Sequence, residues 1–238
     1  MVSEIQKIGF SILFILNIRW WMMKIIRKEK IKENISVLSK GIYAGIMIGI
    51  GGTIYLSVSN QVVGAILFAI GLLTICVYKM NLYTGMIGYI LENKLGYLKT
   101  LIFTLLGNFI GTLITAYLVL NTRIASIGIR AKEISMIKIN DSYLSVFILA
   151  IFCGILMYIA VNNFKKREDS IIKYLSIFIC VVVFILCGFE HCIANMYYIS
   201  LAKAWSSKSA ISMVFMIFGN SFGAIIMSLF NNKIKTNV

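Results

Sequence analysis

The sequence contains no proline and only one histidine in 238 residues, and it has few acidic groups, with 9 Asp and Glu against 23 Lys and Arg. Charged residues make up 13% of the chain, about half of the roughly 25% that is usual in soluble domains. This shortage excludes a soluble globular domain. The hydrophobic share of 60% excludes intrinsic disorder. Five cysteines, an odd and small number for this length, argue against a secreted disulfide scaffold.

The sequence does contain long apolar runs, which raise the mean hydropathy to +0.90. A membrane-spanning helix needs about 20 apolar residues, so the length accommodates roughly six or seven spans. Six apolar blocks are present, and polar residues interrupt the second and the fifth: 35–59, 62–91, 98–120, 143–161, 171–202 and 210–230. We therefore predict an all-α polytopic membrane protein, with a transmembrane domain over 35–230 and a short cytoplasmic tail over 231–238.

Residues 1–34 form a separate segment in this interpretation. Arg19 and Lys24 interrupt its apolar stretch, and Trp20 and Trp21 stand beside Arg19. Tryptophan and basic side chains are typical of helices that lie at the membrane–water interface. We expect an amphipathic interfacial helix here, with a seventh span as the alternative. A cleaved signal peptide is not expected, because no small-residue cleavage site follows.

The basic residues predict the orientation. If the N-terminus is cytoplasmic, 16 of the 23 Lys and Arg lie on the cytoplasmic side and six lie outside, while Lys79 lies within a span. The positive-inside rule then places both termini in the cytoplasm, with the protein in the plasma membrane. Most of the net charge of +14 therefore reflects topology and does not indicate a nucleic-acid partner.

The two halves of the chain resemble each other. A GN-x-x-G motif at 107–111 recurs 112 residues later at 219–223. The break near 79–84 likewise recurs about 110 residues later, near 188–192. Each half, 35–120 and 143–230, holds three predicted spans, so the second copy must be inverted relative to the first. Inverted repeats with a broken helix in each half indicate a permeation or binding site near the membrane midplane, because exposed backbone groups cannot face lipid.

His191 and Glu190 stand together at the second break. Ionisable residues inside a membrane are costly and usually face the bundle interior or an aqueous path, so we predict a functional role for His191. A carboxylate would obstruct an anion path. We therefore expect Glu190 to point away from the pore and to contact backbone donors or a lysine.

Other polar residues near the breaks and in the GN-x-x-G motifs have two interpretations each. The Thr84 hydroxyl either bonds back to its own helix or serves the site, and Lys79 is either a fixed cation that attracts anions or extends to the interface. Asn108 and Asn220 either bond neighbouring helices or shape the cavity. The glycines of the two GN-x-x-G motifs are interpreted as packing contacts.

We considered two other classes. His191, Glu190 and Cys192 could form the site of a membrane-embedded enzyme, but no second histidine or carboxylate cluster accompanies them, so metal or acid–base chemistry has too few groups. The alternative is a non-conducting sensor subunit. We predict no enzyme activity, no metal and no cofactor.

Specific motifs carry a family resemblance over about residues 36–230. The segment NLYTG at 81–85 resembles the DLFTG or ELFTG motif of the formate/nitrite transporter family, and GFEHCIANM at 188–196 is similar to its GFEHSIANM signature. The two GN-x-x-G motifs and AGIMIGIGG also match patterns of that family.

The resemblance implies a homopentamer of aquaporin-like protomers, each with one pore for small monovalent anions of weak acids such as formate, nitrite or hydrosulfide. It implies a central pore histidine at His191 with Thr84 as its hydroxyl partner. Leu82 and Tyr83 would belong to the outer apolar constriction, and Phe189 to that constriction or the inner one. The pore and substrate-binding residues implied or suspected in this way are His191, Thr84, Leu82, Tyr83, Phe189, Asn195 and Lys79.

Some positions depart from the family pattern. Tyr158 stands where the family commonly has asparagine, and Ser142 where a lysine is usual, with Lys138 one turn earlier. Ser200 replaces a proline, and Lys79 replaces a small residue. For transport, we expect either a neutral histidine in an anion channel or transfer of a proton to the anion, which would make transport proton-coupled.

Overall fold

The computed structural model describes the backbone of residues 2–166 and 170–236 and the side chains of residues 29–166 and 170–234. Throughout this described part the protein is helical and contains no strand. The helices are α1 (Val2–Ser57), α2 (Gln61–Val77), α3 (Tyr83–Met86), the 3₁₀ helix η1 (Ile87–Glu92), α4 (Gly96–Leu120), α5 (Ile127–Asn140), α6 (Tyr143–Lys166), α7 (Ile171–Leu186), α8 (Cys192–Leu201) and α9 (Ser207–Thr236).

Four segments are long and apolar enough to cross a membrane: Glu29–Ser57, Gly96–Leu120, Tyr143–Lys166 and Ser207–Ile234. The apolar blocks predicted to be interrupted are divided into shorter helices instead. α2 is followed by α3 and η1, and α7 is followed by α8. The positions of both predicted breaks are therefore confirmed.

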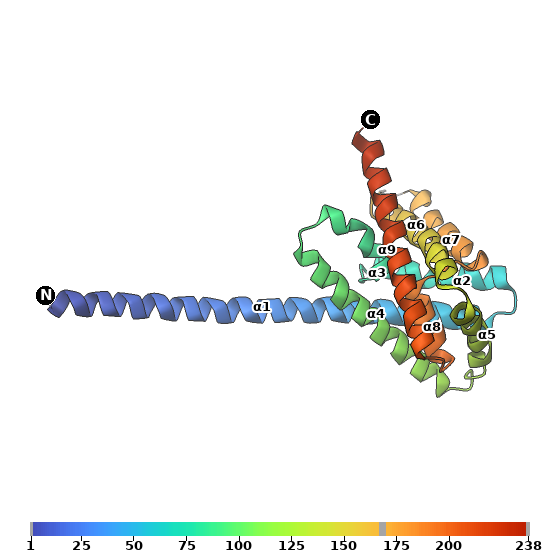
Figure 1. The fold of residues 1–238 in the computed structure, drawn as a ribbon, viewed down its shortest axis with the longest axis horizontal. Coiled ribbons are helices and arrows are strands. Elements are labelled where there is room, and N and C mark those ends of the chain that lie inside the picture. The colour runs from blue at the N-terminus through green and yellow to red at the C-terminus, as the bar shows by residue number, and fades with distance from the viewer. Residues whose placement is uncertain (1, 167–169, 237–238) are drawn as a thin grey trace.

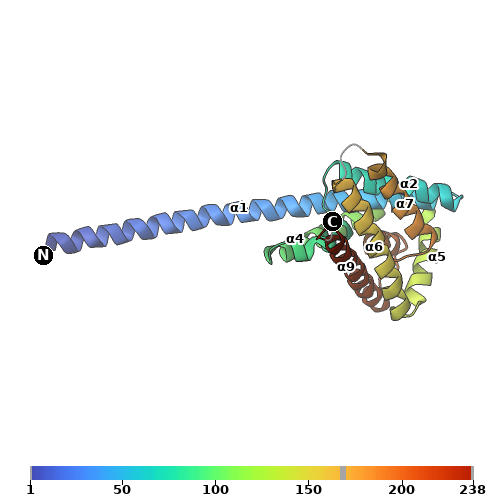
Figure 2. The same ribbon diagram turned by 90° about the horizontal axis from the view of Figure 1, so that it is seen from above.

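α1 is longer than the first apolar block. It continues without interruption from Val2 to Ser57, and Figures 1 and 2 show its N-terminal part extending in a straight line away from the other helices. The side chains of residues 1–28 lie outside the described part, so the interfacial location of residues 1–34 stays a prediction. At the other end of the chain, α9 continues to Thr236 and includes most of the predicted tail.

Glycines allow the long helices to cross at close range in two equivalent places. α1 packs against α4, and a Cβ at Gly45 would collide with the backbone carbonyl of Asn108. α6 packs against α9, and a Cβ at Gly154 would collide in the same way with the carbonyl of Asn220. Small residues that permit such backbone contact are typical of membrane helix packing. On the partner helices, a Cβ at Gly111 would collide with the carbonyl of Ile42, and one at Gly223 with that of Ile151. The packing interpretation of the GN-x-x-G glycines is thereby supported in both halves.

Both helix breaks begin with the same turn. Lys79 follows α2 with φ 52°, and Gly188 follows α7 with φ 67°. In each turn this residue donates its backbone N–H three residues back, and the next residue donates five residues back: Met80 to Ile75, and Phe189 to Phe184. This is the Schellman ending of an α-helix. The helices therefore end without proline.

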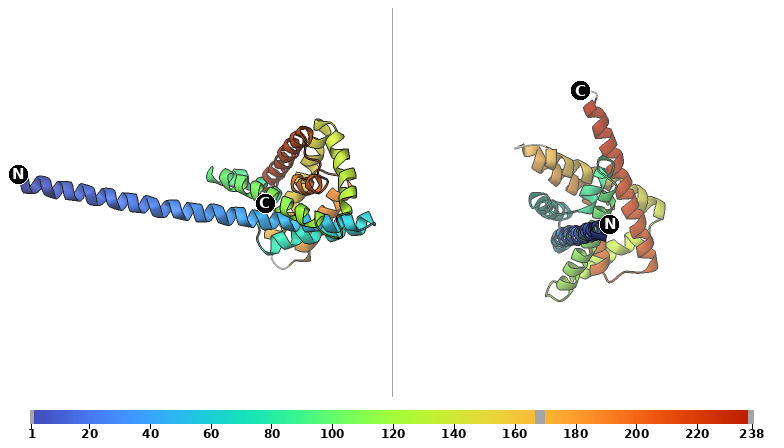
Figure 3. Two further views of the ribbon diagram at one scale, coloured as in Figure 1. Left: turned by 90° about the horizontal axis from the view of Figure 1, so that it is seen from below. Right: turned by 90° about the vertical axis from the view of Figure 1, so that its left-hand side faces the viewer.

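α5 was not expected, because residues 121–142 lack a long apolar run. Its buried residues Ala131, Ser135 and Ile139 recur every fourth position, and two of the three are small. The helix packs against α8, which is buried along nine of its ten residues. Figure 3 shows α8 end-on in the interior of the bundle. α5 thus closes one side of the second break.

Candidate functional site

The two breaks meet at a hydrogen bond between Thr84 and His191. Thr84 is the second residue of α3, and His191 directly precedes α8. The Thr84 Oγ1 atom lies 2.9 Å from Nε2 of His191, and the two residues are only 1% and 2% exposed. Within the described residues Thr84 Oγ1 has no bond to its own helix, so its back-bonding alternative is not what the structure shows.

The second ring nitrogen of His191 determines its protonation pattern. Nδ1 accepts the backbone N–H of Ala194 at 3.0 Å and so caps the N-terminus of α8. A nitrogen that accepts a hydrogen bond carries no proton, so the neutral ring has its hydrogen on Nε2 and donates to Thr84. The Thr84 hydroxyl hydrogen is then free to donate to a third group. Phe184 stacks on the imidazole at 5.5 Å between centroids.

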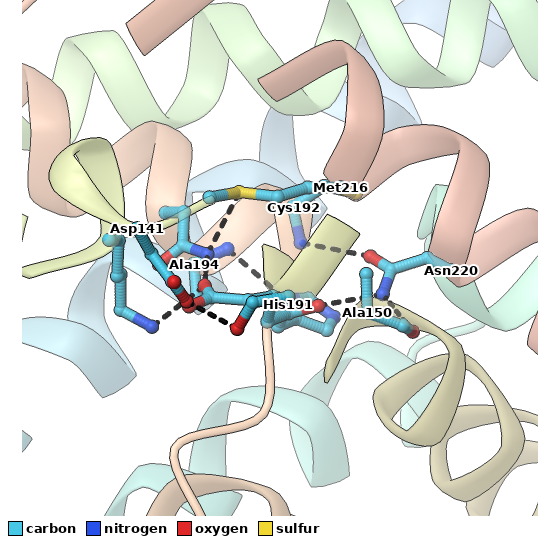
Figure 4. A network of polar contacts seen from close by, with 11 residues as sticks. Asp141, Ala150, His191, Cys192, Ala194, Met216 and Asn220 are labelled. Atoms are coloured by element: carbon cyan, nitrogen blue, oxygen red, sulfur yellow. Dashed lines mark hydrogen bonds and ion pairs between the residues drawn. The ribbon is translucent and has the colours of Figure 1, made fainter. Parts of the chain in front are cut away.

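Asn220 fastens the second break to the neighbouring long helices (Figure 4). Its side chain accepts the backbone N–H of Cys192 at 2.9 Å and donates to the carbonyls of Ala150 and Glu190 at 2.8 and 2.7 Å. The groups of Cys192 and Glu190 would otherwise be unpaired where the helix is broken, and the bond to Ala150 reaches α6. Asn220 therefore bonds across helices and, in doing so, shapes the site.

Asn108 does the same at the first break. It accepts the N–H of Tyr83 at 2.9 Å and donates to the carbonyls of Gly41 and Asn81, both at 2.8 Å. The two open interpretations of each asparagine thus coincide.

Glu190 pairs with a lysine, although it lines the same pocket as His191. Its Oε2 lies 2.7 Å from Nζ of Lys138 on α5, and Asn195 Nδ2 donates to the same oxygen at 2.5 Å. Glu190 is 3% exposed, so this pairing compensates a charge that is removed from water. The expectation of a lysine partner is confirmed, and Lys138 occupies that place. Asn195, predicted among the pore residues, donates a hydrogen bond to Glu190, and it lines one pocket together with His191.

Two cavities lie next to the Thr84–His191 pair. The histidine pocket, of about 230 Å³, is lined by His191, Phe189 and Lys138 among others. The lysine pocket, of about 420 Å³, includes Leu82 and Gly85, the residues that enclose Tyr83 and Thr84 in sequence. The buried pair therefore stands between two spaces that open to different parts of the molecule.

The positions of these cavities bring two of the predictions into conflict. Leu82 was expected at an outer constriction, yet it shares the lysine pocket with Lys165 and Lys173, which the positive-inside rule places in the cytoplasm. Phe189 lies in the other pocket. The two expectations cannot both hold, because Leu82 and these lysines line one cavity. Tyr83 directs its hydroxyl to Ser221 of α9 at 2.9 Å.

The described side chains include no group of three or more His, Cys, Asp and Glu able to hold a metal ion. All five cysteines are free thiols. Glu190 bonds Lys138 and Asn195, whereas His191 bonds Thr84 and Ala194. The side chains of Glu190 and His191, which were considered for an enzyme site with Cys192, thus bond different partners and not each other.

Apolar spanning helices, with two broken helices whose N-terminal ends meet at buried polar side chains, define a multi-pass membrane transport protein. Comparison with known proteins then identifies its family. The family model described as "Formate/nitrite transporter" matches residues 22–232. The chain belongs to the formate/nitrite transporter family, whose members are channels and transporters rather than enzymes.

Relatives of similar sequence carry the same description. The chain is 28% identical over 216 residues to the formate-nitrite transporter of Plasmodium malariae, covering 77% of this chain and 69% of that protein. It is 26% identical over 243 residues to that of Plasmodium falciparum (isolate 3D7), covering 85% and 79%. The formate channel FocB of Escherichia coli (strain K12) is 24% identical over 193 residues, covering 73% and 68%.

A solved structure described as a pentameric formate channel with formate bound has the same fold. Its TM-score is 0.73 at 23% sequence identity, with 86% of this chain and 98% of that chain covered. A second structure, an ion channel of the same family, has a TM-score of 0.71 at 20% identity and covers 89% of this chain and 93% of its own.

Proposed function

We propose that the protein is a channel that passes small monovalent anions of weak acids, such as formate, nitrite or hydrosulfide, across the plasma membrane. The observation that carries the proposal is the buried Thr84–His191 pair at the meeting point of α3 and α8. The N-terminal end of a helix has a positive partial charge. Both broken helices direct that end to the pair, which favours an anion there.

The donor at the pair suits a dehydrated anion. A bare anion in a medium of low dielectric constant has a large solvation cost unless hydrogen bonds or a counter-charge replace the lost water. His191 Nε2–H donates to Thr84, and this bond leaves the Thr84 hydroxyl hydrogen as the donor for an anion. Leu82 forms the apolar constriction on the lysine-pocket side, and Phe189 forms the one on the opposite side. Lys79 increases the anion concentration in the lysine pocket.

The state of His191 favours conduction of the charged anion. A doubly protonated ring would lose the hydrogen bond from Ala194, because Nδ1 would become a donor. The neutral ring keeps this cap. Proton-coupled passage of the neutral weak acid is the second mode, and it requires a proton that does not reside on His191.

The architecture proposed for this function is an inverted repeat of three plus three spans in an aquaporin-like protomer, with both termini in the cytoplasm. Equivalent contacts support the repeat. In the first half, Asn81 donates its backbone N–H to the carbonyl of Lys40. In the second half, Glu190 donates its backbone N–H to the carbonyl of Leu149, and both of these residues lie about 110 positions after their counterparts. Each protomer would hold its own pore in a homopentamer, as the similar pentameric formate channel suggests.

The test is anion flux into liposomes that contain the purified protein, with formate, nitrite and hydrosulfide supplied separately. Wild type should conduct at least one anion, and His191→Ala and Thr84→Ala should both reduce the flux. Imposing a membrane potential separates the modes, because anion conduction responds to the potential and neutral-acid passage does not. Unchanged flux in both variants would contradict the pore assignment. A wild type that conducts none of the anions would favour the non-conducting sensor.

A further inference from the structure

The lysine pocket concentrates positive charge between α2, α3, α6 and α7. Lys79, Lys165 and Lys173 line one cavity of about 420 Å³. Among the described residues its lining includes no Asp or Glu, and the side-chain amide of Asn81 adds a polar group. Cations that share a concave space with walls of low dielectric constant reinforce one another's field. Such a pocket attracts an anion more strongly than three separate surface lysines would.

Two of the ammonium groups are positioned over aromatic rings, and neither forms an ion pair with a carboxylate among the described residues. The Nζ atom of Lys165 lies 4.3 Å from the ring centroid of Tyr89, and that of Lys173 lies 4.5 Å from the ring of Phe164. A cation over an aromatic face is held by the ring quadrupole, which leaves its full charge in place. Both charges therefore remain available to a ligand in the pocket.

Lys79 occupies a backbone position that disfavours lysine. Its φ of 52° lies in the left-handed region, and the equivalent residue of the second break is Gly188 with φ 67°. Glycine adopts this conformation freely, whereas a side chain with a Cβ does not. The Lys79 side chain makes no hydrogen bond, ion pair or ring contact with any residue in the described part of the chain. The Lys79 ammonium group is therefore unpaired within the described part of the chain and can face a ligand in the pocket.

We propose that the lysine pocket is a binding site for a compact multivalent oxyanion, one that carries two or more negative charges, such as a diphosphate or a tricarboxylate. The attraction between charges grows with their product, so three ammonium groups favour a multivalent anion over formate. The cavity is also far larger than a single small monovalent anion needs. An anion in this pocket covers Leu82 and Gly85 and thereby blocks the route to Thr84. The block, unlike the binding, rests on the proposed channel function.

The binding test uses calorimetry of the detergent-solubilised full chain with inorganic pyrophosphate, at low and at high salt. The key variant is Lys79→Gly, which removes one charge and relieves the backbone strain, so it should fold at least as well as wild type. Lys203→Gly is the matched control. Lys203 has the same φ of 52°, but it lines a different pocket together with Lys132 and Lys208. That pocket tests whether three lysines are sufficient, because none of them is held over an aromatic ring among the described residues, as Lys165 and Lys173 are. We expect pyrophosphate to bind wild type and Lys203→Gly equally, and to bind Lys79→Gly about tenfold more weakly.

The flux test places pyrophosphate on the lysine-pocket side of liposomes during formate transport. We expect inhibition in wild type and in Lys203→Gly, with about tenfold more pyrophosphate needed in Lys79→Gly. Absence of calorimetric binding to wild type, or equal loss in both glycine variants, overturns the site. Binding without inhibition in a protein that conducts formate overturns the block. A protein that binds pyrophosphate but conducts no anion contradicts the channel function and leaves the binding site standing.

Discussion

Lys138 and Glu190 form a buried ion pair across 2.7 Å, and it links α5 to the second helix break. Removing one member of a buried pair leaves an uncompensated charge, which typically costs about 3–5 kcal/mol. We expect Lys138→Met to lower the melting temperature of the purified protein strongly. The double variant Lys138→Met/Glu190→Gln should recover most of the loss, because it leaves no unpaired charge. The exposed Lys132→Met on the same helix is the control. A small effect of Lys138→Met alone would show that the pair is not structural.

Thr84 should matter through its hydroxyl group rather than its shape. Valine has nearly the same volume as threonine but no hydrogen-bond donor, whereas serine keeps the hydroxyl. We expect Thr84→Val to reduce formate flux in liposomes by about tenfold, the effect of losing roughly 1.4 kcal/mol of hydrogen bonding at the site. Thr84→Ser should stay close to wild type. Equal flux in the two variants would mean that the hydroxyl facing His191 does not contact the anion.

Asn220 should be indispensable for folding. Replacing it with leucine would leave two buried backbone groups at the break unpaired, the N–H of Cys192 and the carbonyl of Glu190, and would remove the bond to Ala150 of α6. Each unpaired group costs about 1–3 kcal/mol, so Asn220→Leu should yield little folded protein by size-exclusion chromatography. Asn121→Leu is the control, since the single bond of Asn121 lies at the exposed end of α4. A well-folded Asn220→Leu would contradict the assigned role of this asparagine.

Gly45 should tolerate no side chain. A methyl group there would meet the carbonyl of Asn108, which is backbone and cannot rotate away. Overpacking of this kind costs about 1–3 kcal/mol, so Gly45→Ala should lower the melting temperature, and Gly154→Ala should do the same. At Gly96 an added Cβ meets nothing within 4 Å. Gly96→Ala should therefore melt at or above the wild-type temperature.

The apolar pattern predicts much of the fold because lipid exposure requires continuous hydrophobic helices. The ends of α4 lie within two residues of the predicted block 98–120, about the usual uncertainty of a helix boundary. α7 begins with the fifth block at Ile171 and ends two residues before the break predicted near 188–192. The two breaks were predictable from the polar residues at Lys79 and Glu190. A lysine was one of the two kinds of partner expected for Glu190, because a carboxylate would obstruct an anion path, but the structure alone identifies it as Lys138. The pairing of Thr84 with His191 came from family resemblance, since it joins residues that are distant in the sequence.

The remaining features depend on three-dimensional context. α5 escaped prediction because its buried face presents Ala131 and Ser135, which give no hydrophobic signal. The continuation of α1 before residue 35 contains polar residues that do not interrupt a helix. Leu82 and Phe189 are both apolar residues beside a break. Only the packing of α6 and α7 around Leu82 shows which cavity each one enters.

The two broken helices continue after their breaks with different kinds of helix. The second continues as ten residues of α-helix, while the first has four and then six residues of 3₁₀ helix, Ile87–Glu92. Hydrogen bonds of a 3₁₀ helix have poorer geometry, and runs of this length are uncommon. The segment after the first break is therefore the more easily deformed side of the proposed pore. Amide hydrogens of Ile87–Glu92 should exchange with deuterium before those of Cys192–Leu201, and any widening of the passage should start from that side.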